Sequence, residues 1–142
     1  MKMDDLELAK KELDNTGADL VFVKNGKIVF CSNEDSVKGF VLAIKKFGGE
    51  LKNSSVADRI AGRAVAMLCL YAEIKSIFAK TMSESCKDVL RKNRIVFEFE
   101  KLVPSILNKN KNDICPLEKL TLKIENPQTT FEELCKFLNL SV

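Results

Sequence analysis

Apolar residues recur along the chain with two different periods, which predicts a domain that contains both helices and strands. Residues 4–15 carry apolar side chains at helical spacing, and Gly17 follows as a helix stop. Two short apolar runs, 20–24 and 27–31, flank Asn25-Gly26. Because Asn-Gly accepts positive φ at both central turn positions, this segment predicts a two-residue β-hairpin.

The rest of the chain alternates between the two periods. The expected order is a helix opened by Ser32 and Asp35 and ended by Gly48-Gly49, a helix 56–72, a strand 74–79, a helix 84–92 capped by Ser83, a strand 95–99, a helical turn at 104–107, a helix with Pro116 at its first position, and a C-terminal helix capped by Thr130 and Glu133. This order predicts an α/β fold with helices on both faces of a mixed sheet, in which the hairpin is the only antiparallel pair.

The helix 56–72 has the strongest apolar character, and its start carries polar residues. Ser55 and Asp58 have the spacing of a capping box, and Ser55 is the expected N-cap. Gly62 lies near this start, where a glycine costs about 1 kcal/mol relative to alanine. We therefore expect Gly62 to permit a close backbone approach.

Composition places the chain among single folded domains. With 142 residues, 46% hydrophobic and 30% charged, residues 1–142 suffice for one domain with a substantial core. The net charge of +3 is spread along the chain, so nucleic acid is not an expected partner, and the basic segment 108–112 is interpreted as a solvated loop. The longest apolar run has nine residues, too few to cross a membrane. Five cysteines without a secretion signal favour reduced thiols and a cytoplasmic protein.

The absence of histidine excludes more classes of catalytic and metal site than any other feature of the composition. No Ser-His-Asp triad, Cys-His pair, imidazole base or imidazole-containing metal site can be built from this chain. No glycine-rich nucleotide fingerprint is present either. Any catalysis must use carboxylates, lysine, tyrosine, thiols, hydroxyls or an external cofactor, and the sequence predicts neither a cofactor nor a metal.

The order of hairpin, buried helix, strand, helix and strand resembles the cytidine-deaminase fold. In that fold two helix starts meet at the reaction centre, where H-x-E and P-C-x-x-C hold a catalytic zinc. Assigning those starts to residues 55–64 and 81–86 leaves only Cys86 as a soft ligand. The resemblance therefore implies a three-layer α/β/α deaminase-like domain, beginning with a β-hairpin, that is not a zinc-dependent deaminase.

Three segments strengthen a narrower resemblance over roughly residues 5 to 125. They are Ala57-Asp58-Arg59-Ile60-Ala61-Gly62-Arg63-Ala64, Val103-Pro104-Ser105-Ile106-Leu107-Asn108-Lys109 and Cys115-Pro116-Leu117-Glu118. Together they resemble an uncharacterised family of bacterial and archaeal proteins that has this fold without the zinc motif. In that family a lysine usually stands at position 63 and an arginine at position 109. These exchanges keep the charge and change its geometry.

The candidate site consists of Ser55, Asp58, Arg63, Ser83, Asn108, Cys115 and Glu118, which we expect to bind a nucleotide or a related anionic small molecule. Helix starts and Arg63 would attract the anion, and Asp58 would bind a hydroxyl or an amine. Most of these residues also have a purely structural interpretation: Ser55, Asp58 and Ser83 as helix caps, and Cys115 and Glu118 as a turn. Outside the candidate site, Cys31, Cys69 and Cys135 are interpreted as core residues.

Two alternatives stay open at this point. The first is a structural or regulatory subunit that self-associates, as a homo-oligomer, through its C-terminal helix. The second is an enzyme with Cys115 or Cys86 as a covalent catalyst, since a thiol at a helix start has a lowered pKa. Burial or a neighbouring carboxylate would raise that pKa and oppose the second alternative.

Overall fold

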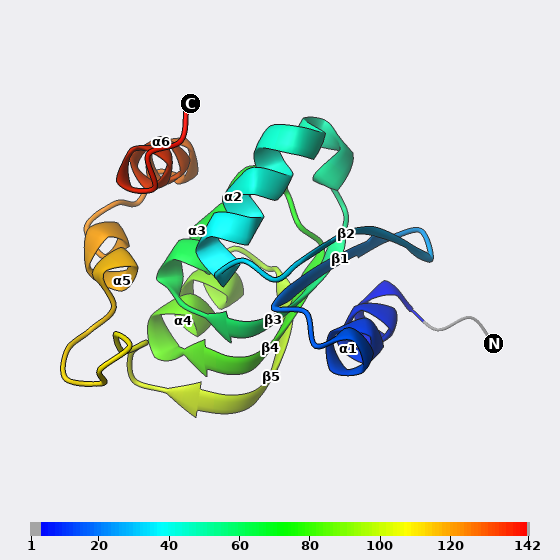
Figure 1. Ribbon diagram of the computed structural model, residues 1–142, viewed down its shortest axis with the longest axis horizontal. Helices are drawn as coiled ribbons and strands as arrows, with labels where there is room; N and C mark the ends of the chain where they lie inside the picture. The colour runs from blue at the N-terminus through cyan, green and yellow to red at the C-terminus, as the bar shows by residue number, and fades with distance from the viewer. Residues whose placement is uncertain (1–3, 142) are drawn as a thin grey trace.

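A computed structural model describes residues 4–141 and shows one five-stranded sheet with the strand order β2-β1-β3-β4-β5 (Figure 1). The strands are β1 (Leu20–Lys24), β2 (Lys27–Ser32), β3 (Ser55–Ala61), β4 (Ser76–Ser83) and β5 (Val96–Val103). β1 pairs antiparallel with β2 and with β3, whereas β3, β4 and β5 are parallel. The sheet is mixed, as expected, but it has a second antiparallel pair, because the helix that follows the hairpin returns the chain to the opposite side of β1.

The helices alternate with the strands from β2 onward. They are α1 (Asp5–Thr16), α2 (Ser36–Phe47), the 3-10 helix η1 (Gly48–Leu51), α3 (Arg63–Ala72), α4 (Glu84–Lys92), α5 (Pro116–Thr121) and α6 (Pro127–Phe137). Within residues 4–141, no helix has the length and apolar character that crossing a membrane requires.

The hairpin and the first helix follow the local signals closely. Asn25 and Gly26 both have positive φ, 53° and 76°, as a type I′ turn requires. Gly17 ends α1 in the left-handed region with φ of 70°. These features depend only on neighbouring residues, which is why the sequence predicts them.

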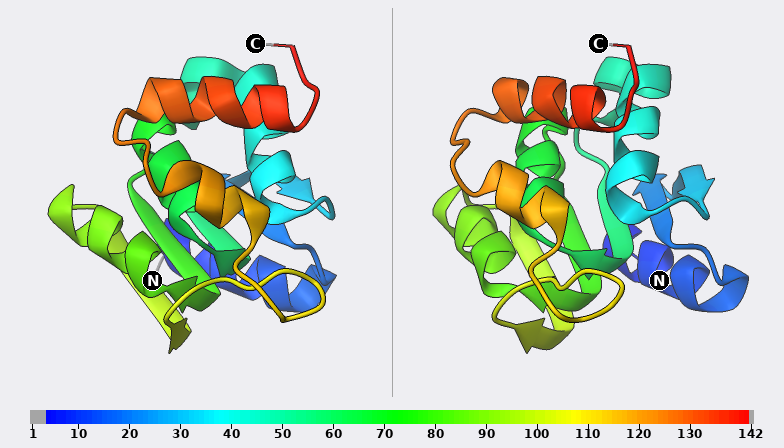
Figure 2. Two further views of the ribbon diagram at one scale, coloured as in Figure 1. Left: turned by 90° about the vertical axis from the view of Figure 1, so that its left-hand side faces the viewer. Right: turned by 60° about the vertical axis from the view of Figure 1, so that its left-hand side comes forward.

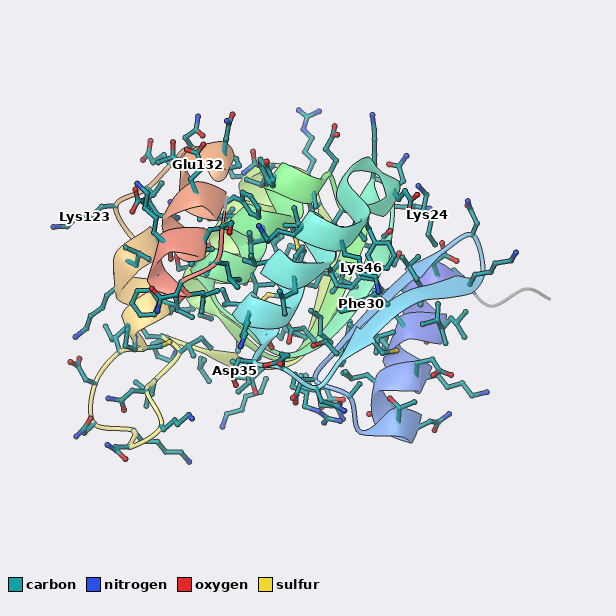
Figure 3. All side chains as sticks on the ribbon, turned by 45° about the horizontal axis from the view of Figure 1, so that its top comes forward. Lys24, Phe30, Asp35, Lys46, Lys123 and Glu132 are labelled. Atoms are coloured by element: carbon teal, nitrogen blue, oxygen red, sulfur yellow. The ribbon has the colours of Figure 1, made fainter. Side chains whose placement is uncertain are left out.

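The helices cover the two faces of the sheet unequally, which gives the expected three layers (Figures 1 and 2). α1 alone packs on one face, through Leu6, Ala9 and Leu13. α2, α3 and α4 lie on the other face over the larger core, and α6 packs outside α3. At the edge of this core, Phe30 of β2 lies against Phe47 of α2, with ring centroids 5.7 Å apart (Figure 3).

The segment 55–61 is a strand, so the prediction that a helix begins at residue 56 is wrong. β3 lies between β1 and β4 in the middle of the sheet, with Val56 and Ala57 buried, and Gly62 alone connects it to α3. Seven strand residues run into a helix with no turn residue between them except that glycine. The apolar pattern therefore continues across the boundary, and periodicity alone cannot locate it.

Several other boundaries differ from the predictions. Asp35 is the N-cap residue of α2, and the Ser32 hydroxyl instead accepts from the Glu34 N–H. Asn126, rather than Thr130, caps α6. Residues 104–107 form no helix, and Cys31 is exposed on the edge strand instead of lying in the core. The helix starts at Glu84 and Pro116 agree with the sequence.

Candidate functional site

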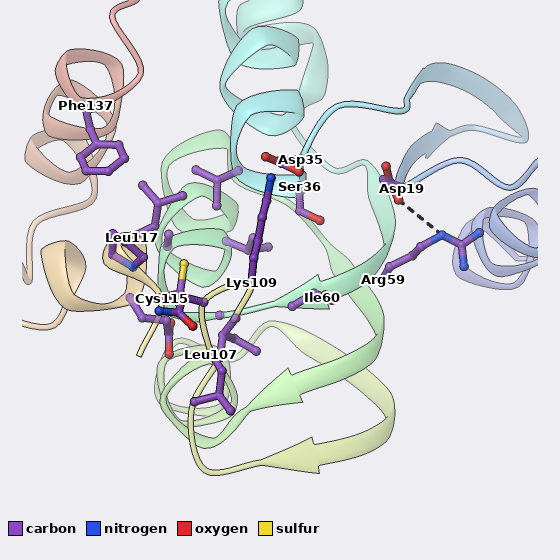
Figure 4. Close-up of a pocket in the computed structure, with 18 of the residues that line it drawn as sticks. Asp19, Asp35, Ser36, Arg59, Ile60, Leu107, Lys109, Cys115, Leu117 and Phe137 are labelled. Atoms are coloured by element: carbon purple, nitrogen blue, oxygen red, sulfur yellow. Dashed lines mark ion pairs between the residues drawn. The ribbon is translucent and has the colours of Figure 1, made fainter. Parts of the chain in front are cut away.

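A pocket of about 690 Å³ opens at the carboxyl ends of the parallel strands, where ligands bind in open α/β sheets (Figure 4). Its walls come from the end of β3, the starts of α2 and α3, the loop before α5, and α5 itself. The lining residues are Asp19, Asp35, Ser36, Val37, Arg59, Ile60, Gly62, Ala64, Val65, Ile106, Leu107, Asn108, Lys109, Asn110, Cys115, Pro116, Leu117, Glu118 and Phe137.

Apolar side chains that are open to solvent lie on several sides of the pocket (Figure 4). Ile60, Leu107 and Phe137 are large apolar residues with about half of their surface exposed, 50%, 48% and 50% respectively. Isolated exposed apolar residues are ordinary, but here three of them border one cavity. Such a lining suits a planar or aliphatic group of a small molecule.

The start of α2 faces the pocket without a cap. Asp35 occupies the N-cap position, yet its side chain makes no capping hydrogen bond. In the part of the chain that the structure describes, no protein group accepts from the N–H groups of Ser36 and Val37, and both residues line the pocket. The positive end of the helix dipole is therefore directed at the cavity.

Asp58 lies beneath this helix start, in the middle of β3. It is fully buried, and its Oδ1 accepts from the Ser36 hydroxyl and, at 3.3 Å, from the Ile60 N–H. Its Oδ2 has no hydrogen-bond partner. Burial raises the pKa of Asp58 to about 7, because the hydrogen bond from Ser36 and those from the backbone offset only part of the desolvation and the nearby Asp19 opposes ionisation.

The start of α3 is also at the pocket, but the protein's own carboxylate closes it. Glu118 of α5 is only 4% exposed, and its Oε1 accepts from the Arg63 N–H at the first residue of α3. Gly62 makes room for this group, since a Cβ there would overlap the Glu118 carboxylate and lie 3.1 Å from Cγ1 of Ile106. The close approach expected at Gly62 is thus an approach by a side chain.

Arg63 completes a reciprocal clamp between α3 and α5. Its Nε donates to the Thr121 carbonyl at 2.8 Å, and its Nη2 donates to the Ile124 carbonyl at 2.9 Å. The guanidinium therefore binds the carbonyl end of α5 while Glu118 binds the amide end of α3. Both residues were predicted to contact a ligand; the structure gives both a role in holding α5 in place, and Arg63 does not line the pocket.

The other predicted residues separate into two groups. Asn108 and Cys115 line the pocket with Glu118, so three of the predicted residues meet there. Ser55 lies at the opposite end of β3, where its hydroxyl is 2.7 Å from that of Ser76, and is not an N-cap. Ser83 caps α4 by accepting from the Cys86 N–H at 3.1 Å, outside the pocket lining.

The two cysteine candidates also differ. Cys86 is buried, and desolvation raises the pKa of its thiol well above the usual range, which opposes a nucleophilic role. Cys115 is half-buried at the pocket and precedes α5, but its side chain makes no capping hydrogen bond.

Sequence reasoning missed Ser36 as a site residue. The segment Ser32-Asn33-Glu34-Asp35-Ser36 has four potential capping residues, and the sequence favours the first of them, Ser32, as the helix start. Arg59 and Asp19 were also missed. The Arg59 guanidinium donates to the carbonyls of Ala18 and Leu13, and its Nε lies 3.6 Å from Oδ1 of Asp19. The positive charge of Arg59 is therefore already paired with groups of the protein.

The assignment of β3 changes which helix starts correspond to the zinc-binding starts of the deaminase fold. The helix after the hairpin is α2, and the next is α3, rather than α3 and α4. The residues there are Ser36-Val37-Lys38 and Gly62-Arg63-Ala64, without a histidine or a cysteine. Across residues 4–141 no group of three or more potential metal ligands is found. The fold is that of a deaminase-like α/β protein, and these two helix starts carry none of the residues that bind zinc in the deaminases.

The chain belongs to the family described as TM1506, a domain of unknown function (DUF1893), which matches residues 8–138. A crystal structure of a DUF1893 family protein from Thermotoga maritima is similar, with a TM-score of 0.87, 25% identity, and coverage of 96% of this chain and 92% of that chain. The dCMP deaminase of cyanophage S-TIM5 in apo form shares the fold at a TM-score of 0.52 and 17% identity, over 70% of this chain and 99% of that one. No curated protein matches.

Proposed function

We propose that this protein binds a nucleotide or a related anionic small molecule in the pocket between the starts of α2 and α3. The observation that carries the proposal is the uncapped start of α2, whose free N–H groups face a 690 Å³ cavity. A helix N-terminus with unpaired N–H groups attracts an anion through both hydrogen bonds and the helix dipole.

Lys109 supplies the mobile positive charge that such a ligand needs. It extends from the loop before α5 toward Ser36 and Asp35 at the start of α2 (Figure 4). The anionic group would lie between the Lys109 ammonium and the amides of Ser36 and Val37. Apolar residues of the pocket lining, among them Ile60 and Leu107, would then contact a base or another ring.

The carboxylates of the pocket should favour a ligand that carries little negative charge over one that carries several charges. Asp35 is exposed and close to the expected anion position, and Glu118 already fills the start of α3. A highly charged polyphosphate would be repelled by both of these carboxylates. We therefore expect a monophosphate or a carboxylate to bind more tightly than a triphosphate.

Calorimetric titration of the full chain with nucleosides, their monophosphates and their triphosphates tests this function. Lys109→Gln removes a pocket charge, and Lys111→Gln in the same exposed loop, outside the pocket lining, is the matched control. Losing a charge-assisted hydrogen bond costs about 1.5–3 kcal/mol, so K109Q should weaken monophosphate binding by roughly tenfold or more. No saturable binding, or equal losses in K109Q and K111Q, would refute the proposal.

Self-association through the C-terminal helix is the weaker candidate, because that helix uses its apolar face within the fold. Phe131, Leu134 and Cys135 of α6 are buried, and the Phe131 ring is stacked on Tyr71 of α3 with centroids 4.7 Å apart. Phe137 alone is a large exposed apolar residue of α6, and it belongs to the pocket.

A further inference from the structure

Ser36 combines three features that occur together at a nucleophile. It is the first residue of α2, its hydroxyl donates to the buried Asp58, and it lines the pocket. The N–H of the next residue, Val37, is one of the groups at this helix start that has no acceptor within residues 4–141. A hydroxyl bonded to a base and followed by a free N–H at a helix start is the arrangement that acyl transfer requires.

We infer that Ser36 is the nucleophile of an ester-cleaving site, with Asp58 as its general base and the Val37 N–H as a donor to the developing oxyanion. The inference goes beyond ligand binding because it adds the Ser36 hydroxyl and Asp58, which are not needed to hold an anion, while the Val37 N–H is shared with the proposed anion site. The substrate class is an ester whose apolar acyl group contacts exposed apolar residues of the pocket such as Ile60 and Leu107.

The reaction balances with water as the only co-reactant. The Ser36 Oγ forms a bond to the ester carbonyl carbon while its proton passes to Asp58. The tetrahedral intermediate then expels the alcohol as the C–O bond breaks, and Asp58 returns the proton to the alcohol oxygen. Water from the pocket then attacks the acyl carbonyl carbon and the bond from that carbon to the Ser36 Oγ breaks; one proton of the water returns to the Ser36 Oγ, and the other stays on the released carboxylic acid.

The surroundings of Asp58 allow it to accept a proton. Its Oδ1 bonds only to the Ser36 hydroxyl and to backbone N–H groups, and no basic side chain in the described chain pairs with it. The charge of Asp19 opposes ionisation of Asp58, and Arg59, whose Nε lies 3.6 Å from Asp19, donates to the backbone carbonyl of Ala18. On the helical side the neighbouring titratable groups are the thiols of Cys69 and Cys86, both of which burial keeps neutral by raising their pKa.

A structural Ser–Asp hydrogen bond would explain part of this arrangement. It would not require Ser36 to border a cavity, nor leave the adjacent N–H without an acceptor. A catalytic pair also differs from a structural pair in its kinetics: if Asp58 is the general base, the reactivity of the Ser36 hydroxyl must rise as Asp58 ionises.

Labelling of the full chain with an alkyl fluorophosphonate tests whether the reactivity of Ser36 depends on Asp58. The Ser36 Oγ would attack phosphorus, the P–F bond would break, and the proton would pass to Asp58, so intact mass spectrometry should show one adduct that maps to Ser36. Ser36→Ala should abolish the adduct, and Asp58→Asn should slow its formation by roughly 100-fold, since a general base contributes about 10²–10⁴-fold. Ser85→Ala is the matched control, because Ser85 is also half-buried at a helix start and lies outside the pocket lining.

The pH profile of the unmodified protein keeps the test valid if D58N fails to fold. The labelling rate should rise with pH and level off above about pH 7, where Asp58 is ionised. Absence of an adduct, an adduct on another residue, or a rate that does not change across pH 5–8 would overturn the inference. Calorimetric nucleotide titration of the unmodified protein separates the two proposals: saturable binding by a protein that the fluorophosphonate does not label leaves ligand binding standing and overturns only catalysis, whereas labelling of Ser36 without nucleotide binding does the reverse.

Discussion

The starts of α2 and α3 occupy corresponding places in the fold, and each has a buried carboxyl group nearby, yet the two carboxyls act differently. At α3, Glu118 from a distant helix binds the first N–H directly. At α2, Asp58 lies one hydroxyl away, behind Ser36, and the N–H groups remain free. The first arrangement closes a helix end and positions α5; the second leaves a helix end open to the pocket.

This comparison shows that a helix N-terminus becomes a ligand site only where the fold provides no internal acceptor for it. A search for capping residues in the sequence assigns a capping pair to both helices, Ser32 with Asp35 and Ser55 with Asp58. Only the structure shows that none of these side chains caps α2 or α3, and that Glu118, 55 positions along the chain from Arg63, accepts from the first N–H of α3 instead.

The largest expected effect concerns the pH dependence of stability. The folded pKa of Asp58 is about 7, above its unfolded value of 3.8, so between these values the folded state binds more protons than the unfolded state. Stability should therefore fall by about 2.7 kcal/mol as pH rises from 5 to 8, because about two pH units of this window lie below the folded pKa and each contributes about 1.36 kcal/mol. Urea unfolding at each pH measures this, and no histidine titrates in the same window.

Asp58→Asn should remove that dependence, because an amide does not ionise. D58N is expected to match the original protein most closely at pH 5 and to be the more stable of the two at pH 8. A profile for the unmodified protein that is flat from pH 5 to 8 would show that Asp58 is not the titrating group and would weaken the contrast between the two carboxyls.

Removal of the internal cap of α3 has the next largest effect. Glu118→Ala should lower the free energy of unfolding by about 2–3 kcal/mol, because the half-buried Arg63 N–H loses its carboxylate acceptor. Chemical denaturation measures the loss, and Glu125→Ala, outside the pocket lining near the end of α5, is the control. Equal stability of E118A and E125A would contradict the clamp.

A smaller loss is expected when the space for that cap is filled. Gly62→Ala places a Cβ where the Glu118 carboxylate lies, and overpacking of this kind costs about 1–3 kcal/mol. The double variant G62A/E118A should lose less than the sum of the two single changes, since they share one contact. Additive losses would mean that Gly62 and Glu118 act independently.

The smallest effect should come from the N-cap that makes no capping bond. Asp35→Ala is expected to change stability by less than about 0.5 kcal/mol, whereas Asn126→Ala at the start of α6 should cost about 1 kcal/mol. A comparison of thermal unfolding for the two variants checks this. A loss in D35A as large as that in N126A would mean that α2 is capped in solution and is not open to a ligand.

Local signals predicted much of the fold and less of the site. The hairpin, the stop at Gly17 and the starts of α4 and α5 follow from residues that are neighbours in the chain. β3 was misassigned because a single glycine separates it from α3. Of the site, Asn108, Cys115 and Glu118 line the pocket, whereas Ser36 was missed and Arg63 turned out to bind α5.

The amino-acid sequence by itself determined most of the alternation of helices and strands, the lack of histidine and of a C-x-x-C pair, and the turn at Asn25-Gly26, because these depend on composition or on short-range conformational preference. Tertiary structure alone decided which helix start is closed and which is open. That outcome depends on whether a distant carboxylate reaches the helix end, and side chains from β3 and α5 meet these helices only after the sheet has formed and the chain has returned to the pocket.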